Sequence, residues 1–308
     1  MNPYTSRPSE SVAALGEERL ITSIRRWLGN VCPESPFGIG DDCAVLRPSP
    51  HAQLVTVDPV IFGRHFDESV PPRSVGAKLM KRNLSDIAAM GGRPRAAVIS
   101  LSLDARTRTR WVEEFYRGLA AAARRFGVEI VGGDVAQDAT IAASLTLIGE
   151  ATAGRTLTRT GARSGDWIFV TGQLGNTLRT GHHYRFTPRI AEGAWLARKR
   201  EVRAMMDVSD GLAKDLRALT PPGAAPALDS RSIPLRKGAD LRAALSDGED
   251  YELLFAVAGT ANLDAFASAW RRAFPRVRLS RIGRFVTAAA FPEGAVDLRD
   301  YHGYEHLR

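Results

Sequence analysis

The 308-residue sequence contains only two cysteines, Cys32 and Cys43, too few for a disulfide framework or a cysteine-based zinc site. No window approaches 18 uninterrupted apolar residues, which argues against a membrane-spanning helix. The first residues, MNPYTSRPSESVAAL, show no basic region leading into an apolar run, as a targeting segment would. We therefore expect an unprocessed cytoplasmic protein with reduced thiols and no membrane partner.

The sequence also has few lysines, five in all, although its net charge is +8. The basic residues are scattered arginines without a basic run or interleaved aromatic residues, which argues against a nucleic-acid partner. We interpret this charge as a codon or surface bias toward arginine. An excess of positive charge would also suit a small, highly anionic substrate.

Two common nucleotide-binding motifs are missing. The sequence contains no G-x-x-x-x-G-K-[ST] segment, and its glycine-rich loops do not follow the dinucleotide-binding fingerprint. Any nucleotide bound here would therefore have to be held through metal ions.

Apolar periodicity predicts an α/β (α+β) protein of two domains, 1–152 and 153–308, with mixed sheets flanked by helices. In the first half we expect the sheet to carry helices on one face. One strand should begin near residue 51 and end at Asp58 and Pro59, and the GGD segment should form a glycine turn after another strand. Helices are expected over 11–28, 74–90, 108–127, 189–200 and 261–274, and further strands over 95–103, 128–136, 140–152, 248–258 and 276–286.

Aspartates recur beside glycines and at the expected ends of elements. Singly, each could form an Asx turn or cap a helix, and Ser209 or Asp210 could cap the helix that begins at Gly211. Together, however, gathered carboxylates repel one another unless cations neutralise them. The absence of histidine and cysteine at ligand spacing favours magnesium or manganese over zinc or copper. The candidate acids are Asp41, Asp42, Asp58, Asp86, Asp134, Asp207 and Asp210.

The order of several motifs resembles that of thiamine-monophosphate kinases, a family within the aminoimidazole ribonucleotide synthetase-like superfamily. The motifs are GIGDDCAVL, GRHF, NLSDIAAMGGRP, GGD, LTRTGARSGDWIFVTG, MDVSDGLAKDL, GEDYELLF and GYEH. The resemblance runs from about Gly16 to Tyr304, and the combination of motifs is specific. It implies the two-domain fold of that superfamily.

The resemblance also implies roles for individual residues. Those matching metal ligands are Asp42, Asp58, Asp86, Asp134, Asp207 and Asp210; Thr56 and the backbone of Val57 could add oxygens where the family usually has a second threonine. Those matching ATP contacts are Gly133, Asp134, Arg159 and Ser209. Those matching contacts to thiamine phosphate are His65, Glu249 and Tyr304, although without the resemblance a packed structural histidine is the better interpretation of His65. The segment 178–186 is shorter than the family commonly has.

The resemblance implies ATP-dependent phosphorylation of thiamine monophosphate to thiamine diphosphate, with several magnesium ions and ATP as co-substrate. No residue is expected to act as a general base, because the ionised acceptor phosphate can attack directly. The resemblance also implies a homodimer joined through the N-terminal sheets. It further implies that domain 1–152 binds ATP and magnesium and that domain 153–308 completes the active site. Two alternatives stay open: the same fold acting with ATP on another phosphorylated or carboxylated metabolite, and a non-catalytic binder of nucleotides or nucleic acid.

Overall fold

The computed structural model describes residues 1–40 and 43–305. Its contacts divide the chain into two compact units. The first unit comprises Met1–Ile87 and Arg93–Glu150, and the second comprises Ala88–Gly92 and Ala151–Arg308. The roles expected of domains 1–152 and 153–308 stay predictions.

The first unit is built on a four-stranded sheet with the strand order β1-β4-β2-β3. Its strands are β1 (Gln53–Ile61), β2 (Gly92–Leu103), β3 (Glu129–Gln137) and β4 (Ala142–Ala151). Strand β1 pairs with β4 in antiparallel fashion, and β2 pairs with β3 in parallel fashion. The helices are η1 (Pro8–Glu10), α1 (Val12–Leu15), α2 (Glu17–Leu28), η2 (Gly29–Val31), α3 (Pro72–Ala89) and α4 (Thr109–Phe126).

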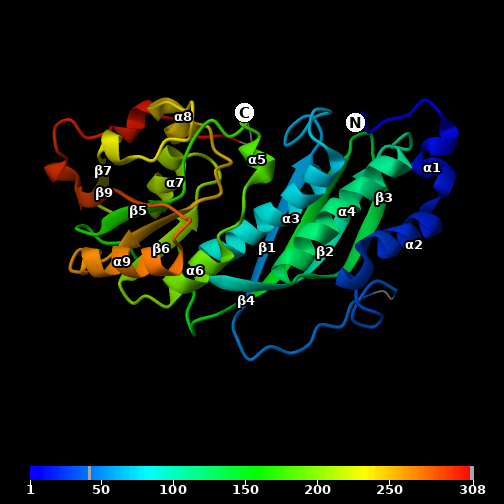
Figure 1. Cartoon of the computed structure of the whole chain (residues 1–308), viewed down its shortest axis with the longest axis horizontal. Coiled ribbons are helices and arrows are strands. Elements are labelled where there is room, and N and C mark those ends of the chain that lie inside the picture. Colours follow the sequence, from blue (N-terminus) through cyan, green and yellow to red (C-terminus); the bar gives the residue numbers. More distant parts are fainter. Residues whose placement is uncertain (41–42, 306–308) are drawn as a thin grey trace. The chain divides into compact units, whose positions relative to one another are not determined.

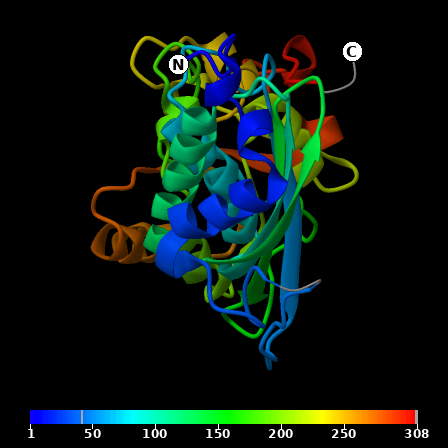
Figure 2. The same cartoon turned by 90° about the vertical axis from the view of Figure 1, so that its right-hand side faces the viewer.

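The helices of this unit lie on one side of its sheet in both views (Figure 1, Figure 2). Helix α4 buries Trp111, Val112 and Phe115 in the core beneath it. Three valines of the strands are instead exposed: Val55 by 67%, Val57 by 61% and Val98 by 37%. The expectation of helices on one face of the first sheet therefore holds, and apolar side chains of β1 and β2 face solvent.

The second unit contains a five-stranded antiparallel sheet with the order β6-β8-β5-β9-β7. Its strands are β5 (Trp167–Thr171), β6 (Val202–Asp207), β7 (Ala224–Leu228), β8 (Leu253–Val257) and β9 (Leu279–Thr287). Its helices are α5 (His182–Arg185), α6 (Ile190–Ala197), α7 (Leu212–Leu219), η3 (Ser230–Ser232), α8 (Leu241–Ser246), α9 (Leu263–Ala273), η4 (Ala288–Ala290) and η5 (Leu298–Asp300).

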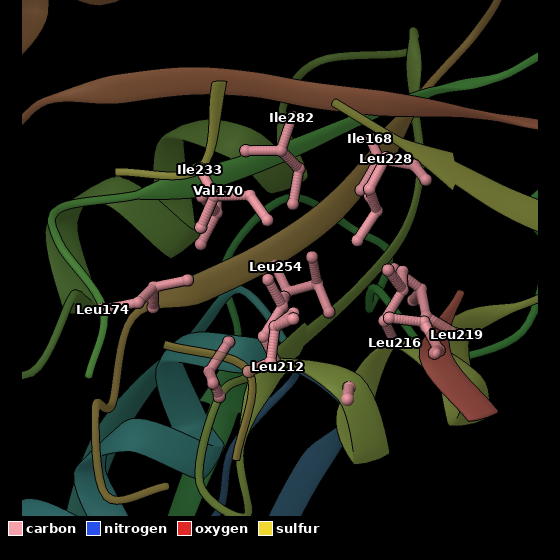
Figure 3. Packing of buried hydrophobic residues seen from close by; sticks show 14 of the residues in the cluster. Ile168, Val170, Leu174, Leu212, Leu216, Leu219, Leu228, Ile233, Leu254 and Ile282 are labelled. Atoms are coloured by element: carbon pink, nitrogen blue, oxygen red, sulfur yellow. The ribbon is translucent and has the colours of Figure 1, made fainter. Parts of the chain in front are cut away.

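Successive residues along the strands of this sheet pack into two different apolar clusters. Ile168 and Val170 of β5 pack with Leu212 and other residues in one cluster (Figure 3). Phe169, between them in the sequence, belongs to the second cluster, which includes Trp270. Because successive strand residues point to opposite faces, this sheet is buried on both sides. The expected pair of sheets flanked by helices is thus confirmed.

Four local predictions are wrong. The strand expected over 248–258 begins only at Leu253, because residues 248–252 form a loop with left-handed backbone at Glu249 and Tyr251. The helix expected over 11–28 is divided into α1 and α2 at Gly16, whose φ of 76° does not continue a helix. Strand β1 continues past Pro59 to Ile61; it is an edge strand, where a residue without an N–H is tolerated. The GGD segment lies within β3 instead of forming a turn.

Among the helices in the described part of the chain, none is both long and apolar enough to cross a membrane.

Candidate functional site

A polar cluster joins β1 to α3 in the first unit. The Thr56 hydroxyl donates to Asp86 Oδ2 at 2.5 Å. Asp58, two residues along the same strand, lies on the same side as Thr56 and has Arg82 Nε 3.3 Å from its Oδ2. Arg82 also donates to the carbonyl oxygen of Pro59 at 2.7 Å. Three predicted metal-site residues, Thr56, Asp58 and Asp86, are therefore brought together, with a guanidinium beside Asp58.

Val57 lies between Thr56 and Asp58 on β1, but its side chain is not part of this cluster. The Val57 side chain points to the exposed face of β1, so only its backbone could contribute an oxygen near Asp58. Asp42, together with Asp41, lies outside the described residues.

His65 follows β1 in a turn. Its Nδ1 accepts a hydrogen bond from the Ile61 N–H at 3.1 Å, so the neutral ring carries its proton on Nε2. The His65 carbonyl oxygen accepts from the buried Lys78 ammonium at 2.9 Å. One ring nitrogen is thus used to hold the turn.

Gly133 and Asp134 lie on β3, at the opposite edge of the sheet from β1. Three strand spacings separate β1 from β3, about 14 Å. A side chain at position 133 would meet the Ile99 carbonyl oxygen of β2 at 2.3 Å, which gives this glycine a packing role and explains why the strand continues through it. The first unit therefore does not bring these two residues to the Asp58 cluster.

Gly133 and Asp134 line a cavity of about 450 Å³ between α2 and the sheet. That volume is within the ordinary range for a small-molecule site. Most of the lining is apolar, and the Tyr116 ring, whose hydroxyl pKa is raised by burial, forms part of it. The full lining is Ile21, Ile24, Leu28, Ile39, Gly40, Ile99, Tyr116, Ile130, Gly132, Gly133, Asp134 and Val135.

The second unit holds the DVSD loop between β6 and α7. Asp207 ends β6 and is buried, with 3% of its surface exposed. The N–H groups of Ser209 and Asp210 both donate to Asp215 Oδ2, each at 3.1 Å. Helix α7 begins after Gly211 without a side-chain cap, so the alternative in which Ser209 or Asp210 caps it is wrong.

Asp215 was not singled out from the sequence, yet it supports the whole loop. Burial raises its pKa to about 8, and the neighbouring carboxylates of Asp207 and Asp210 act in the same direction. Asp210 in turn has the Lys214 ammonium 2.8 Å from its Oδ2. The carboxyl groups of Asp207, Asp210 and Asp215 thus gather near the end of β6.

Glu249 and Tyr304 meet this loop through their backbones. The Glu249 N–H donates to the Ser209 carbonyl oxygen at 2.7 Å, and the Tyr304 N–H donates to that of Asp210 at 2.8 Å. Lys214 also donates to the Tyr304 carbonyl oxygen at 2.6 Å. Five predicted site residues, Asp207, Ser209, Asp210, Glu249 and Tyr304, therefore gather within the second unit.

The Glu249 carboxylate has two side-chain neighbours that the sequence interpretation missed. His183 Nδ1 lies 3.4 Å from Oε2, and the Tyr251 hydroxyl donates to Oε1 at 3.3 Å. The Tyr251 ring stacks on Phe186 with ring centroids 4.0 Å apart. The short segment 178–186 thus contributes directly to the surroundings of Glu249.

Arg159 lies in the exposed segment that precedes β5. Its neighbour Thr158 accepts a hydrogen bond from the Met205 N–H at 2.9 Å, which ties this segment to the strand that ends at Asp207.

Across residues 1–40 and 43–305, no three His, Cys, Asp or Glu side chains converge as a ready metal-binding group. The predicted acids fall into the β1–α3 cluster of the first unit and the DVSD loop of the second, with Asp134 apart on β3. Sequence signals for the missed residues existed: Asp215 continues the acidic spacing of DVSDGLAKD, and Tyr251 stands inside GEDYE.

A family model described as AIR synthase related protein, N-terminal domain, matches residues 40–151. Thiamine-monophosphate kinase from Rhodopirellula baltica is 37% identical over 247 residues, which cover 73% of this chain and 77% of that protein. The same enzyme from Escherichia coli K12 is 34% identical over 251 residues, covering 72% and 76%.

Solved structures agree with these sequence matches. Thiamine-monophosphate kinase from Stenotrophomonas maltophilia K279a superposes with a TM-score of 0.73 at 31% identity, covering 87% of this chain and 93% of that one. A structure described as AaThiL complexed with AMPPCP and TMP gives a TM-score of 0.69 at 30% identity, covering 96% and 98%. The aminoimidazole ribonucleotide synthetase-like fold expected from the sequence is confirmed.

Proposed function

This chain belongs to the thiamine-monophosphate kinase family, and from that premise we propose that it transfers the terminal phosphoryl group of ATP to thiamine monophosphate, giving thiamine diphosphate. The observation that carries the proposal is the gathering of Ser209, Asp210, Glu249 and Tyr304 by backbone hydrogen bonds in one unit. The resemblance assigns the first two to ATP and its metal ions and the last two to the thiamine phosphate. Their proximity supports one site that receives both substrates.

The transfer is direct and in line. The acceptor phosphate, with a second pKa of about 6, is ionised near neutral pH and can attack the γ-phosphorus itself. No side chain is needed as a general base or as a covalent carrier. The work of the protein is to hold two anionic substrates in the reacting geometry, where positioning and charge neutralisation dominate the catalysis.

The donor chemistry of both acid groups fits magnesium. Thr56, Asp58 and Asp86 offer hydroxyl and carboxylate oxygens, and Asp207 with Asp210 offers further carboxylates, the ligands that this cation prefers. Asp42 and Asp134 complete the proposed ligand set, with the Val57 backbone. When bound, several magnesium ions would neutralise the phosphates and reduce their mutual repulsion.

We assign ATP contacts to Gly133, Asp134, Arg159 and Ser209. The cavity beside Gly133 and Asp134 supports this assignment, because its apolar lining and the Tyr116 ring suit a flat heterocyclic base. The ring of Tyr116 belongs to a cluster of aromatic residues that includes Phe115, 5.4 Å away between centroids, which fixes its orientation.

We assign the acceptor to His65, Glu249 and Tyr304. A carboxylate can attract the cationic thiazolium ring or accept from an exocyclic amine, and an aromatic ring can stack on it. The Tyr304 residue is 43% exposed, so its ring is accessible in the second unit. His65, with its proton on Nε2, could donate to the substrate phosphate.

The proposal includes a homodimer joined through the sheets of the first units. Support comes from Val55 and Val57 on β1 and Val98 on β2, whose apolar side chains are exposed. Exposed apolar surface can mark a protein interaction site, and a second copy of the same sheet would cover these side chains.

The test is an assay of purified protein with ATP, magnesium and thiamine monophosphate, in which thiamine diphosphate is identified by chromatography. Formation of the diphosphate in proportion to ADP would support the proposal. ADP released only with another phosphorylated or carboxylated acceptor would instead favour the same fold with a different substrate. Absence of ADP with every acceptor would favour a binding protein.

A further inference from the structure

The GEDYE loop has an unusual backbone. Glu249 has a φ of 55° and Tyr251 a φ of 53°, so two residues with side chains adopt the left-handed conformation on either side of Asp250. Residues with side chains rarely adopt this conformation, and it persists only where the surrounding structure holds it. Something in the second unit must therefore hold this loop.

Asp250, between the two strained residues, has no exposed surface. Its Oδ1 accepts from the Gly175 N–H at 2.9 Å and from Arg236 Nη2 at 3.1 Å. Its Oδ2 is also buried and has no hydrogen-bond partner within the described chain. A buried carboxyl with one unsatisfied oxygen is costly for stability, so packing alone does not explain the residue.

Arg236 and His182 complete the attachment. Arg236 Nε donates to the Gly175 carbonyl oxygen at 3.0 Å, and its Nη1 lies 3.1 Å from His182 Nδ1. A guanidinium can only donate, so His182 Nδ1 accepts and its Nε2–H donates to the Asp250 carbonyl oxygen, 3.1 Å away. Both the side chain and the backbone of Asp250 are thus fixed by one buried network.

The loop held in this way presents Glu249. The N–H groups on either side of Asp250 donate to the DVSD loop, Glu249 to Ser209 and Tyr251 to the Val208 carbonyl oxygen at 2.8 Å. The same left-handed turn directs the Glu249 carboxylate toward His183 and the Tyr251 hydroxyl. A backbone change at Asp250 would move that carboxylate and loosen its connection to Ser209.

We infer that Asp250 is a positioning residue of the acceptor site, which with Arg236 and His182 holds the left-handed backbone that orients Glu249. The inference rests on the proposed function only in taking Glu249 as an acceptor contact. Asp250 itself touches neither substrate, and its effect passes through Glu249.

The chain offers a matched control in Asp166. This aspartate is also buried, 1% exposed, with Arg203 3.0 Å from its Oδ1. Like Asp250 it accepts from backbone amides, those of Arg163 at 2.8 Å and Gly259 at 3.2 Å. Asp166 immediately precedes β5. Asp250 of the GEDYE loop instead accepts from the N–H of Gly175, in the segment that follows β5. Asp250 is adjacent to Glu249 in the chain, whereas the contacts of Asp166 are with Arg163, Arg203 and Gly259.

The experiment compares Asp250→Ala with Asp166→Ala, and adds Asp250→Asn in case the alanine variant does not fold. Both alanine variants should lose thermal stability. Only Asp250→Ala should raise the KM and Kd for thiamine monophosphate, by roughly tenfold, as expected for a lost buried hydrogen-bond network. The KM for ATP should change less than about twofold. Asp250→Asn keeps an Oδ1 acceptor and should lie between wild type and Asp250→Ala.

Hydrogen exchange gives a readout without substrate. The amides of Glu249 and Tyr251 should be protected in the wild type and in Asp166→Ala, and should exchange faster in both Asp250 variants. Unchanged exchange, or an unchanged Kd for thiamine monophosphate in both Asp250 variants, would overturn the inference. A wild type that does not bind thiamine monophosphate would overturn the proposed function instead, while the exchange comparison would still test whether Asp250 holds the loop.

Discussion

The two units carry their candidate site residues in different ways. In the first unit side chains join β1 to α3: the Thr56 hydroxyl donates to Asp86, and Asp58 pairs with Arg82. In the second unit Ser209 and Glu249 stand on loops and meet through their backbones. Regular elements fix the first group by periodicity, whereas the second group depends on a buried network below the loops.

The buried acids show the same contrast. In the first unit Arg93 and Ser49 hold the pKa of Glu150 down at about 2, with Arg95 2.8 Å away adding to the effect. In the second unit burial raises the pKa of Asp250 to about 8, although Arg236 acts against it. Arginine side chains thus stabilise the charged form of Glu150 in the first unit. In the second unit burial destabilises the charged form of Asp250, whose hydrogen bonds hold the backbone of its loop.

Removing one acid from each unit tests whether both groups are needed, and it should have the largest effect. We expect Asp86→Asn and Asp207→Asn each to lower turnover by about 100-fold or more, because each removes charge that balances the phosphates. Thermal stability should change little, since Asn keeps an oxygen and relieves repulsion between carboxylates. Steady-state kinetics at varied magnesium concentration, with thermal melts, provides the measurement.

Asp104→Asn is the matched control, because the Asp104 carboxylate pairs locally with Arg106, 2.9 Å away, two residues along the chain. It should retain full activity. If either site variant keeps normal turnover and an unchanged magnesium requirement, the acid group of that unit is not needed for catalysis.

The open face of the first sheet provides the next test. A double substitution, Val55→Lys with Val57→Lys, should dissociate the proposed dimer, since burying unpaired charges costs several kcal/mol. Sedimentation equilibrium at micromolar concentration measures the mass. Leu178→Lys, at a residue 65% exposed in the second unit, should leave the mass unchanged. A wild-type monomer, or a double variant that stays dimeric, would argue that this face has another role.

Tyr304 tests the loops of the second unit. Tyr304→Ala removes the ring but keeps the backbone groups that bind Asp210 and Lys214, so the tail should stay attached. We expect a loss of about 1 to 2 kcal/mol in thiamine monophosphate binding and almost none for ATP, by calorimetry. Tyr301→Ala, which removes a ring packed beside Arg242, is the control. Equal losses for both ligands would show a folding defect in place of a lost contact.

The smallest effect concerns acid stability in the first unit. The folded pKa of Glu150 is lowered to about 2, so its contribution to stability is present above the unfolded pKa near 4.5 and is lost as the pH falls toward 2. Arg93 is exposed, so we expect only about 1 kcal/mol. Urea unfolding of Glu150→Gln should differ from wild type at pH 6 and converge with it near pH 2. A difference independent of pH would contradict this assignment.

The comparison also explains how much could be predicted from the sequence. Apolar periodicity found the two sheets and most helices. Gly133 was misread as a turn residue because glycine there serves the approach of the Ile99 carbonyl oxygen, a tertiary requirement. Pro59 was misread as a strand end because edge position is not visible locally.

The geometry of the second unit was less predictable. Residues as distant in sequence as Ser209, Glu249 and Tyr304 meet through main-chain hydrogen bonds, which side-chain patterns do not encode. The left-handed backbone at Glu249 and Tyr251 also follows from tertiary contacts, since neither residue favours it. Their shared surroundings could be expected only from the family resemblance.

The central claim is that both units serve direct phosphoryl transfer to thiamine monophosphate. Rapid-quench kinetics with γ-labelled ATP is its most direct test. Label should appear in thiamine diphosphate in a single step, and incubation with ATP alone should leave no stable label on the protein. Label recovered on a His, Ser or Cys side chain, or label that reaches an acceptor other than thiamine monophosphate in preference to it, would contradict the account.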